Sequence, residues 1–78
     1  MCYTYVYLNT VEKVKDFVGI INTFDGDFDL VIDRYVVDAK SLLAIFSLDI
    51  SNVLRLDIHD ETTFEMVTTA LQDFIVKQ

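Results

Sequence analysis

Hydrophobic and polar residues recur with two different periods along this chain, and these periods predict strands and helices. Alternation with a period of two, in segments rich in β-branched and aromatic residues, predicts strands. It appears over residues 3–8, 28–32, 35–38 and 53–58. Apolar residues spaced by three and four predict helices. The first helix ends near residues 22–23 and carries Val11, Val14, Phe17, Val18 and Ile21 on one face, and the last carries Phe64, Val67, Leu71 and Phe74.

Short polar residues mark where the predicted helices begin. Asn9 or Thr10 opens the first helix, and Asn9 with Glu12 three residues later resembles a capping box. Ser41 opens a short apolar helix over residues 41–48, and Asp60 or Thr62 opens the last one. Asp33-Arg34 joins two strands, although this pair is unusual for a type I′ turn.

The predicted order of elements is β-α-β-β-α-β-α, which favours an α+β fold. Because each strand has one apolar face, the pattern predicts a four-stranded antiparallel sheet covered by three helices on one face, an open-faced sandwich. We expect residues 1–78 to form a single domain. The outer face of the sheet is predicted to carry Tyr3, Tyr5 and Tyr7, with Arg55 and Asp57 beside them.

Composition and charge narrow the classes of partner. Hydrophobic residues make up 53% of the 78 residues, which suits a folded core. The net charge of −7 disfavours binding to nucleic acid or to an anionic membrane surface. The single cysteine, Cys2, cannot form an internal disulfide and favours the reducing cytoplasm. The pattern shows no signal peptide or spanning segment, and we expect no catalytic residue, no metal and no cofactor.

One segment resembles a known family. The residues from Lys40 to Leu48 read Lys-Ser-Leu-Leu-Ala-Ile-Phe-Ser-Leu. This segment, together with the order of elements, resembles HPr, the histidine-containing phosphocarrier of the bacterial sugar phosphotransferase system. In that family a lysine-serine pair opens a short apolar helix. The resemblance implies the HPr-like fold for nearly the whole chain.

The chain departs from the family at the phosphorylation site. HPr proteins carry a histidine at the start of the first helix, followed by an arginine and a proline. Alignment without gaps places Thr10 at the histidine position, Glu12 at the arginine position and Lys13 at the proline position. A shift of one residue places Asn9 there instead, and residues 1–24 contain no histidine. Thr10 and Glu12 are therefore the positions of a degenerate site, and their other interpretation is an ordinary helix cap.

Three further features carry a functional interpretation beside a structural one. Ser41 occupies the position of the family's regulatory serine, so it is a candidate for phosphorylation or simply an N-cap. Four apolar residues crowd the short helix, and those predicted to form a partner surface are Leu42, Leu43 and Phe46. The tyrosines at 3, 5 and 7 either stabilise an exposed sheet or form a second interface. The sole histidine, His59, lies among acids and is expected to be a surface residue rather than a metal ligand.

These observations predict an HPr-like protein that is not an enzyme. We expect a binding or regulatory module connected to the phosphotransferase system, with a protein partner or a second copy of the chain. Two alternatives remain. The chain could be a phosphocarrier that uses a non-standard acceptor, or a structural homo-oligomeric protein with an unrelated role.

Overall fold

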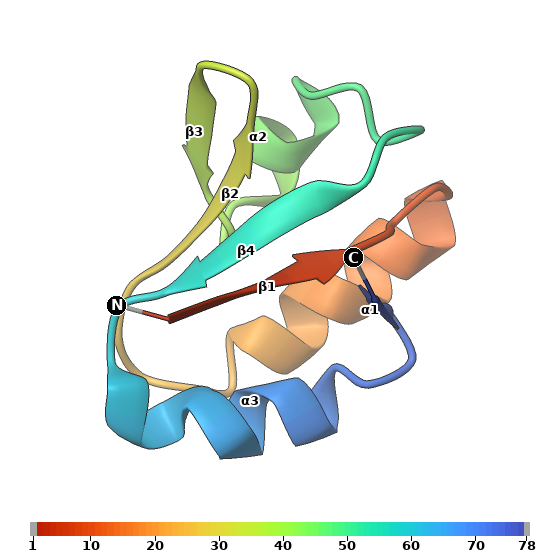
Figure 1. Ribbon diagram of the computed structural model, residues 1–78. Helices are drawn as coiled ribbons and strands as arrows, with labels where there is room; N and C mark the ends of the chain where they lie inside the picture. The colour runs from red at the N-terminus through yellow and green to blue at the C-terminus, as the bar shows by residue number, and fades with distance from the viewer. Residues whose placement is uncertain (1, 78) are drawn as a thin grey trace.

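The segments with strand periodicity all form strands, and they pair into one antiparallel sheet (Figure 1). The computed structural model describes residues 2–77. The strands are β1 (Cys2–Val6), β2 (Phe28–Ile32), β3 (Tyr35–Asp38), β4 (Leu54–Ile58) and β5 (Ile75–Val76). Their order across the sheet is β3-β2-β4-β1-β5. The predicted α+β fold with an antiparallel sheet is confirmed.

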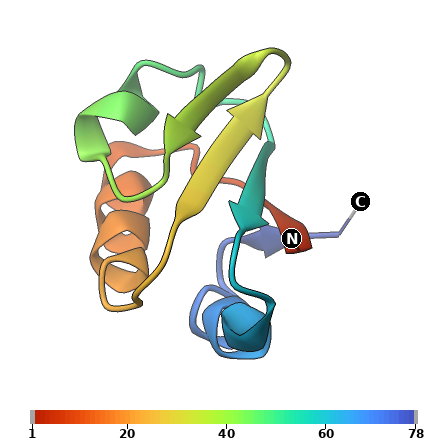
Figure 2. The ribbon, with the colours of Figure 1, turned by 90° about the vertical axis from the view of Figure 1, so that its left-hand side faces the viewer.

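Helices cover one face of this sheet (Figure 2). They are α1 (Val11–Ile21), α2 (Leu42–Phe46) and α3 (Phe64–Ala70), the last preceded by a 3-10 turn, η1 (Glu61–Thr63). The apolar side chains of each strand lie on the inner face of the sheet, because alternate residues point to opposite faces. On β4, for example, Leu54, Leu56 and Ile58 are fully buried, as their alternation predicts.

The core lies between the inner face of the sheet and the helices. Val14, Phe17 and Ile21 of α1 are fully buried there. The rings of Phe17 and Phe74 meet edge to face with their centroids 6.0 Å apart, which joins α1 to the C-terminal segment. Val11 was predicted on the same apolar stripe, but its side chain is 52% exposed. Periodicity identifies the face of a helix, and it does not tell how far the core beneath that face extends.

The C-terminal segment differs from its prediction. The last helix ends at Ala70 rather than continuing to Phe74, and the sheet gains a fifth strand, β5, where four strands were predicted. A turn places the amide of Phe74 2.9 Å from the carbonyl oxygen of Leu71, and the chain then pairs with β1. Phe74 stays buried in this turn, so the apolar spacing alone did not reveal where the helix ends.

The hairpin between β2 and β3 turns at Asp33 and Arg34, as the pattern predicts. Asp33 has a φ of +52°, and it is the one non-glycine residue with positive φ among residues 2–77. Aspartate tolerates this left-handed region better than most residues. The turn places the Asp33 side chain at one end of the sheet, beside the segment that follows α2.

Candidate functional site

The start of α1 holds Thr10 and Glu12, the residues that the family resemblance predicts at the phosphorylation site. Thr10 is the N-cap, and its Oγ1 accepts a hydrogen bond from the amide of Lys13 at 3.1 Å. Of the two predicted cap residues, the structure therefore selects Thr10. Asn9 has a different task, because its Oδ1 accepts a hydrogen bond from Lys13 Nζ at 3.2 Å. Thr10 thus performs the ordinary work of a helix cap.

Glu12 and His59, the only histidine of the chain, lie at different places in the fold relative to Thr10. Glu12 lies exposed in the first turn of α1, where its negative charge suits the helix dipole. The histidine of the chain is remote, because His59 follows Ile58, and Ile58 pairs with Cys2 at the start of β1. Thr10 follows the other end of β1. His59 Nε2 lies 2.8 Å from Asp29 Oδ2 instead, so it is held at the opposite end of the sheet.

Ser41 is the N-cap of α2, as predicted. Its Oγ accepts a hydrogen bond from the amide of Ala44 at 3.2 Å, and its own amide donates to the carbonyl oxygen of Asp38 at 3.1 Å. The side chain is partly exposed. A phosphoryl group on Ser41 Oγ would lie beside the amide of Ala44, where negative charge is favourable.

Lys40 has a structural role that sequence reasoning missed. Its Nζ donates a hydrogen bond to the carbonyl oxygen of Phe24 at 2.6 Å and lies 5.5 Å from the centre of the Phe28 ring. In return, the Lys40 carbonyl oxygen accepts a hydrogen bond from Asn22 Nδ2 at 3.2 Å. Lys40 therefore fastens the entry of α2 to the end of α1. No local pattern signals this, because the contacts join segments 16 and 18 residues apart.

The short helix α2 presents apolar side chains in two directions. Ile45 is fully buried and Leu42 is partly buried against the core. Leu43 is 82% exposed, and Phe46 lies at the boundary with 37% exposed. We name Leu43 and Phe46 the α2 patch. The geometry confirms that this helix is too short to bury all of its large apolar side chains.

The outer face of the sheet carries the predicted aromatic and polar residues. Tyr3 and Tyr5 meet edge to face with ring centroids 5.8 Å apart, and the Arg55 guanidinium lies 5.6 Å from the Tyr3 ring centre. Arg55 also donates two hydrogen bonds to the nearly buried Asp57, at 2.7 and 3.0 Å. These hydrogen bonds and the charge of Asp57 raise the pKa of Arg55. Tyr7 lies beyond β1, where its amide donates to the carbonyl oxygen of Phe74.

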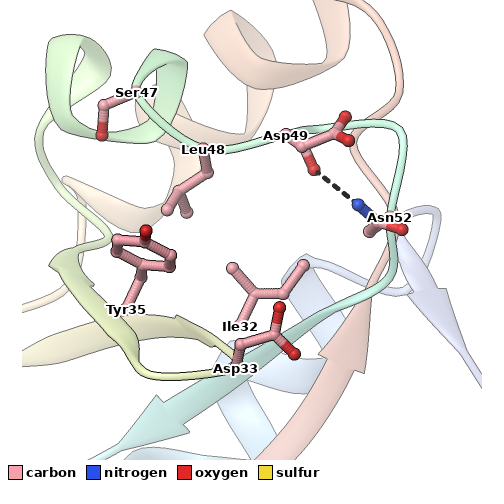
Figure 3. Close-up of a pocket in the computed structure, with 7 residues that line it drawn as sticks. All are labelled: Ile32, Asp33, Tyr35, Ser47, Leu48, Asp49 and Asn52. Carbon is pink, nitrogen blue, oxygen red and sulfur yellow. Dashed lines mark hydrogen bonds between the residues drawn. The ribbon is translucent and has the colours of Figure 1, made fainter.

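A cavity of about 300 Å³ lies between the β2–β3 hairpin and the segment that follows α2 (Figure 3). Sequence reasoning did not predict it. Asp49 lies on its rim, and the hydroxyl and amide of Ser51 lower the pKa of that carboxyl group. The residues that line the cavity are Ile32, Asp33, Tyr35, Ser47, Leu48, Asp49 and Asn52.

Comparison with solved structures identifies the architecture. The crystal structure of HPr-C-His from Thermoanaerobacter tengcongensis matches with a TM-score of 0.78 and 25% sequence identity. The match covers 94% of this chain and 89% of that one. The fold is HPr-like. The resemblance read from the sequence is thereby confirmed at the level of fold, which is that of a phosphocarrier-related family.

No protein-family model matches the chain, and no curated protein matches it. Among residues 2–77, no helix is long and apolar enough to span a bilayer, and no group of three or more His, Cys, Asp or Glu side chains is placed to hold a metal ion.

Proposed function

We propose that this protein is a non-catalytic binding or regulatory module related to the phosphotransferase system. The observation that carries the proposal is the cap of α1. The family resemblance assigns Thr10 to the position of the phosphorylated histidine, and Thr10 Oγ1 accepts a hydrogen bond from the Lys13 amide. The single cysteine favours action in the reducing cytoplasm.

The chemistry of the α1 terminus supports this proposal. Histidine accepts a phosphoryl group because its neutral imidazole is a nucleophile near neutral pH, whereas a threonine hydroxyl needs an adjacent base. The amide of Lys13 is the hydrogen-bond partner of Thr10 Oγ1, and an amide cannot act as a base. Glu12 in the first turn would repel an incoming phosphate. The helix terminus therefore keeps its anion-friendly amides without a residue that can carry the group.

Incubation with phosphoenolpyruvate and the first enzyme of the phosphotransferase system tests the proposal. Intact-mass spectrometry at neutral and acidic pH should show no acid-labile phosphorylated species, while an HPr control is phosphorylated. The Thr10→His variant should gain little, because Glu12 remains. The double variant with Glu12→Arg should gain more than the sum of the single changes. Stoichiometric acid-labile phosphate on the unmodified protein would overturn the proposal and favour a phosphocarrier with another acceptor.

Intact-mass spectrometry after a second incubation, with a lysate in place of the first enzyme, examines Ser41 as a regulatory position. A phosphoserine survives acid, whereas a phosphohistidine does not, so the two kinds of modification separate in the acidic sample. The partly exposed hydroxyl of Ser41 at the start of α2 supports the regulatory role. An acid-stable phosphate that disappears in a Ser41→Ala variant would identify it, when the protein is incubated with a lysate containing serine kinases.

The partner-binding function is assigned to the α2 patch. Leu43 projects from a helix that Lys40 and Asn22 hold firmly, so its exposure is built into the fold. Exposed apolar groups of this kind are typical of protein interfaces. Leu43→Glu should abolish association with a partner or a second copy, measured by pull-down or sedimentation. Val36→Glu is the matched control, because Val36 is an exposed apolar residue on the outer face of the sheet. Loss of association in the control alone would place the interface on the sheet.

A further inference from the structure

The cavity beside the hairpin combines apolar, aromatic and acidic groups around one space. Figure 3 shows Tyr35 and Leu48 on one side of it, Asp49 and Asn52 on the other, and Ile32 with Asp33 below. Asn52 Nδ2 points to the main-chain oxygen of Asp49, at 3.5 Å. The Asp49 carboxylate turns away from the cavity and accepts hydrogen bonds from Ser51 at 2.6 and 3.1 Å. Asp33 thus supplies the carboxylate that remains available to a ligand.

This lining has the features of a site for a basic side chain. The aliphatic side chains of Ile32 and Leu48 can cover the methylene groups of an arginine, and the exposed Tyr35 ring can stack on its guanidinium. The Asp33 carboxylate can accept two parallel hydrogen bonds from the same group. None of the seven lining residues carries a positive charge, so nothing in the lining competes for this carboxylate.

The position of the cavity connects it with the α2 patch. Ser47 and Leu48 of the lining follow Phe46 directly in the chain. The whole chain carries a net charge of −7, which attracts a basic partner and repels an acidic one. A partner that covers Phe46 with an apolar residue can therefore reach the cavity with a neighbouring basic residue.

We propose that this cavity binds an arginine side chain of the protein that docks on the α2 patch. This inference rests on the function proposed above, because that function makes the arginine part of a partner protein. The pocket itself can be tested without any partner. Asp33 is the residue expected to determine the preference for positive charge, with Tyr35 and Leu48 as the surfaces that hold the side chain.

The experiment is an NMR titration of the whole protein with N-acetyl-arginine methylamide. The dissociation constant should be on the order of millimolar, because a single exposed ion pair contributes little. Amide shifts should be confined to residues 32–35 and 46–52. The citrulline analogue, which has nearly the same shape and no charge, should bind more weakly, by up to about fivefold. The affinity for the arginine probe should fall as salt is raised.

Two variants separate a specific site from general attraction to an acidic protein. Asp33→Asn should weaken binding of the arginine probe about fivefold, and it should fold normally because asparagine also tolerates positive φ. Asp25→Asn removes the same charge from an exposed position before β2, at the opposite end of that strand, and should leave binding unchanged. A thermal unfolding scan confirms that both variants are folded.

Three results would overturn the proposal. They are equal binding of the arginine and citrulline probes, shifts outside the cavity, and equal losses in the Asp33→Asn and Asp25→Asn variants. A different result would show that the α2 patch is not the binding surface. In that case Leu43→Glu would leave association intact, while the arginine probe would still bind. The two proposals can therefore fail independently.

Discussion

At the scale of single residues, a side-chain oxygen accepts a hydrogen bond from one amide in the first turn of α1, of α2 and of η1. Thr10 caps α1, Ser41 caps α2 and Asp60 caps η1, with acceptor distances of 3.1, 3.2 and 3.0 Å to the amide nitrogens. Such a cap typically contributes about 1 kcal/mol to stability. The family resemblance implies phosphate chemistry at two of these residues, Thr10 and Ser41. Their role as caps already explains why they are present, so a function in phosphorylation needs evidence of its own.

The cap at Asp60 makes stability depend on pH. The hydroxyl and then the amide of Thr62 donate to its carboxylate and lower the pKa of Asp60 below the ordinary value of 3.8. Because the folded pKa lies below the unfolded one, this group stabilises the fold above pH 3.8 and loses that effect as the pH falls through the folded value. The free energy of unfolding, measured with urea, should fall between about pH 5 and pH 2. Asp60→Asn should show a shallower fall than the parent. Parallel curves would remove Asp60 from the acid response.

Asp33 offers a second residue-scale prediction. Its φ of +52° strains any side chain, so Asp33→Gly should be at least as stable as the parent protein. Asp33→Ala keeps a side chain at this positive φ, so it should be less stable than the glycine variant by about 1 kcal/mol. Urea unfolding of the two variants measures this difference. Equal stability would mean that the turn relaxes when the side chain is changed.

At the scale of elements, α2 carries both buried and exposed apolar side chains. Five residues cannot bury four large apolar side chains, since a helix this short has one inward face. Ile45 occupies that face, and Leu43 points about a hundred degrees or more away from it. Lys40 and Asn22 hold the entrance of the helix, so the direction of each side chain is set by the surrounding fold.

This arrangement predicts opposite results for two neighbouring substitutions. Leu43→Glu should change the free energy of unfolding by less than about 0.5 kcal/mol, because Leu43 is exposed. Ile45→Glu should lower it by several kcal/mol or prevent folding, because it places a charge in the core. Thermal unfolding of both proteins tests the difference. A severely destabilised Leu43→Glu protein would contradict the assignment of Leu43 to the surface.

At the scale of the whole molecule, charge is unevenly balanced. Thirteen acidic residues face six basic ones, and several of the basic groups are engaged locally. Arg55 is paired with Asp57, Lys40 with the Phe24 carbonyl oxygen and Lys13 with Asn9. Negative charges exceed positive ones by seven, so the fold repels itself at low ionic strength.

Salt should relieve this repulsion. The midpoint of thermal unfolding at neutral pH should rise by a few degrees between low and moderate salt, corresponding to about 1 kcal/mol in a domain of this size. Differential scanning calorimetry at two concentrations of sodium chloride measures the change. A flat or falling midpoint would show that local pairs dominate the electrostatics of the fold.

The sequence by itself determined the directions of side chains within each element. The alternation of β4 assigned Leu54 and Leu56 to the core, and the spacing in the short helix left Leu43 outside. It also established that residues 1–24 contain no histidine to carry a phosphoryl group. These features depend on residue type and on the period of one element, which are fully present in the local sequence.

Only the tertiary structure decided the features that join distant segments. Residues 75–76 form β5 because they pair with the free edge of β1. Phe74 is buried as the helical spacing predicts, so that spacing does not reveal that the helix has already ended. Lys40 reaches a carbonyl oxygen 16 residues away, and the cavity brings together Asp33 and Tyr35 of the β2–β3 hairpin with Asn52 of the segment that follows α2. No local pattern contains these contacts, because they arise from how the packed sheet and helices place the ends of their elements.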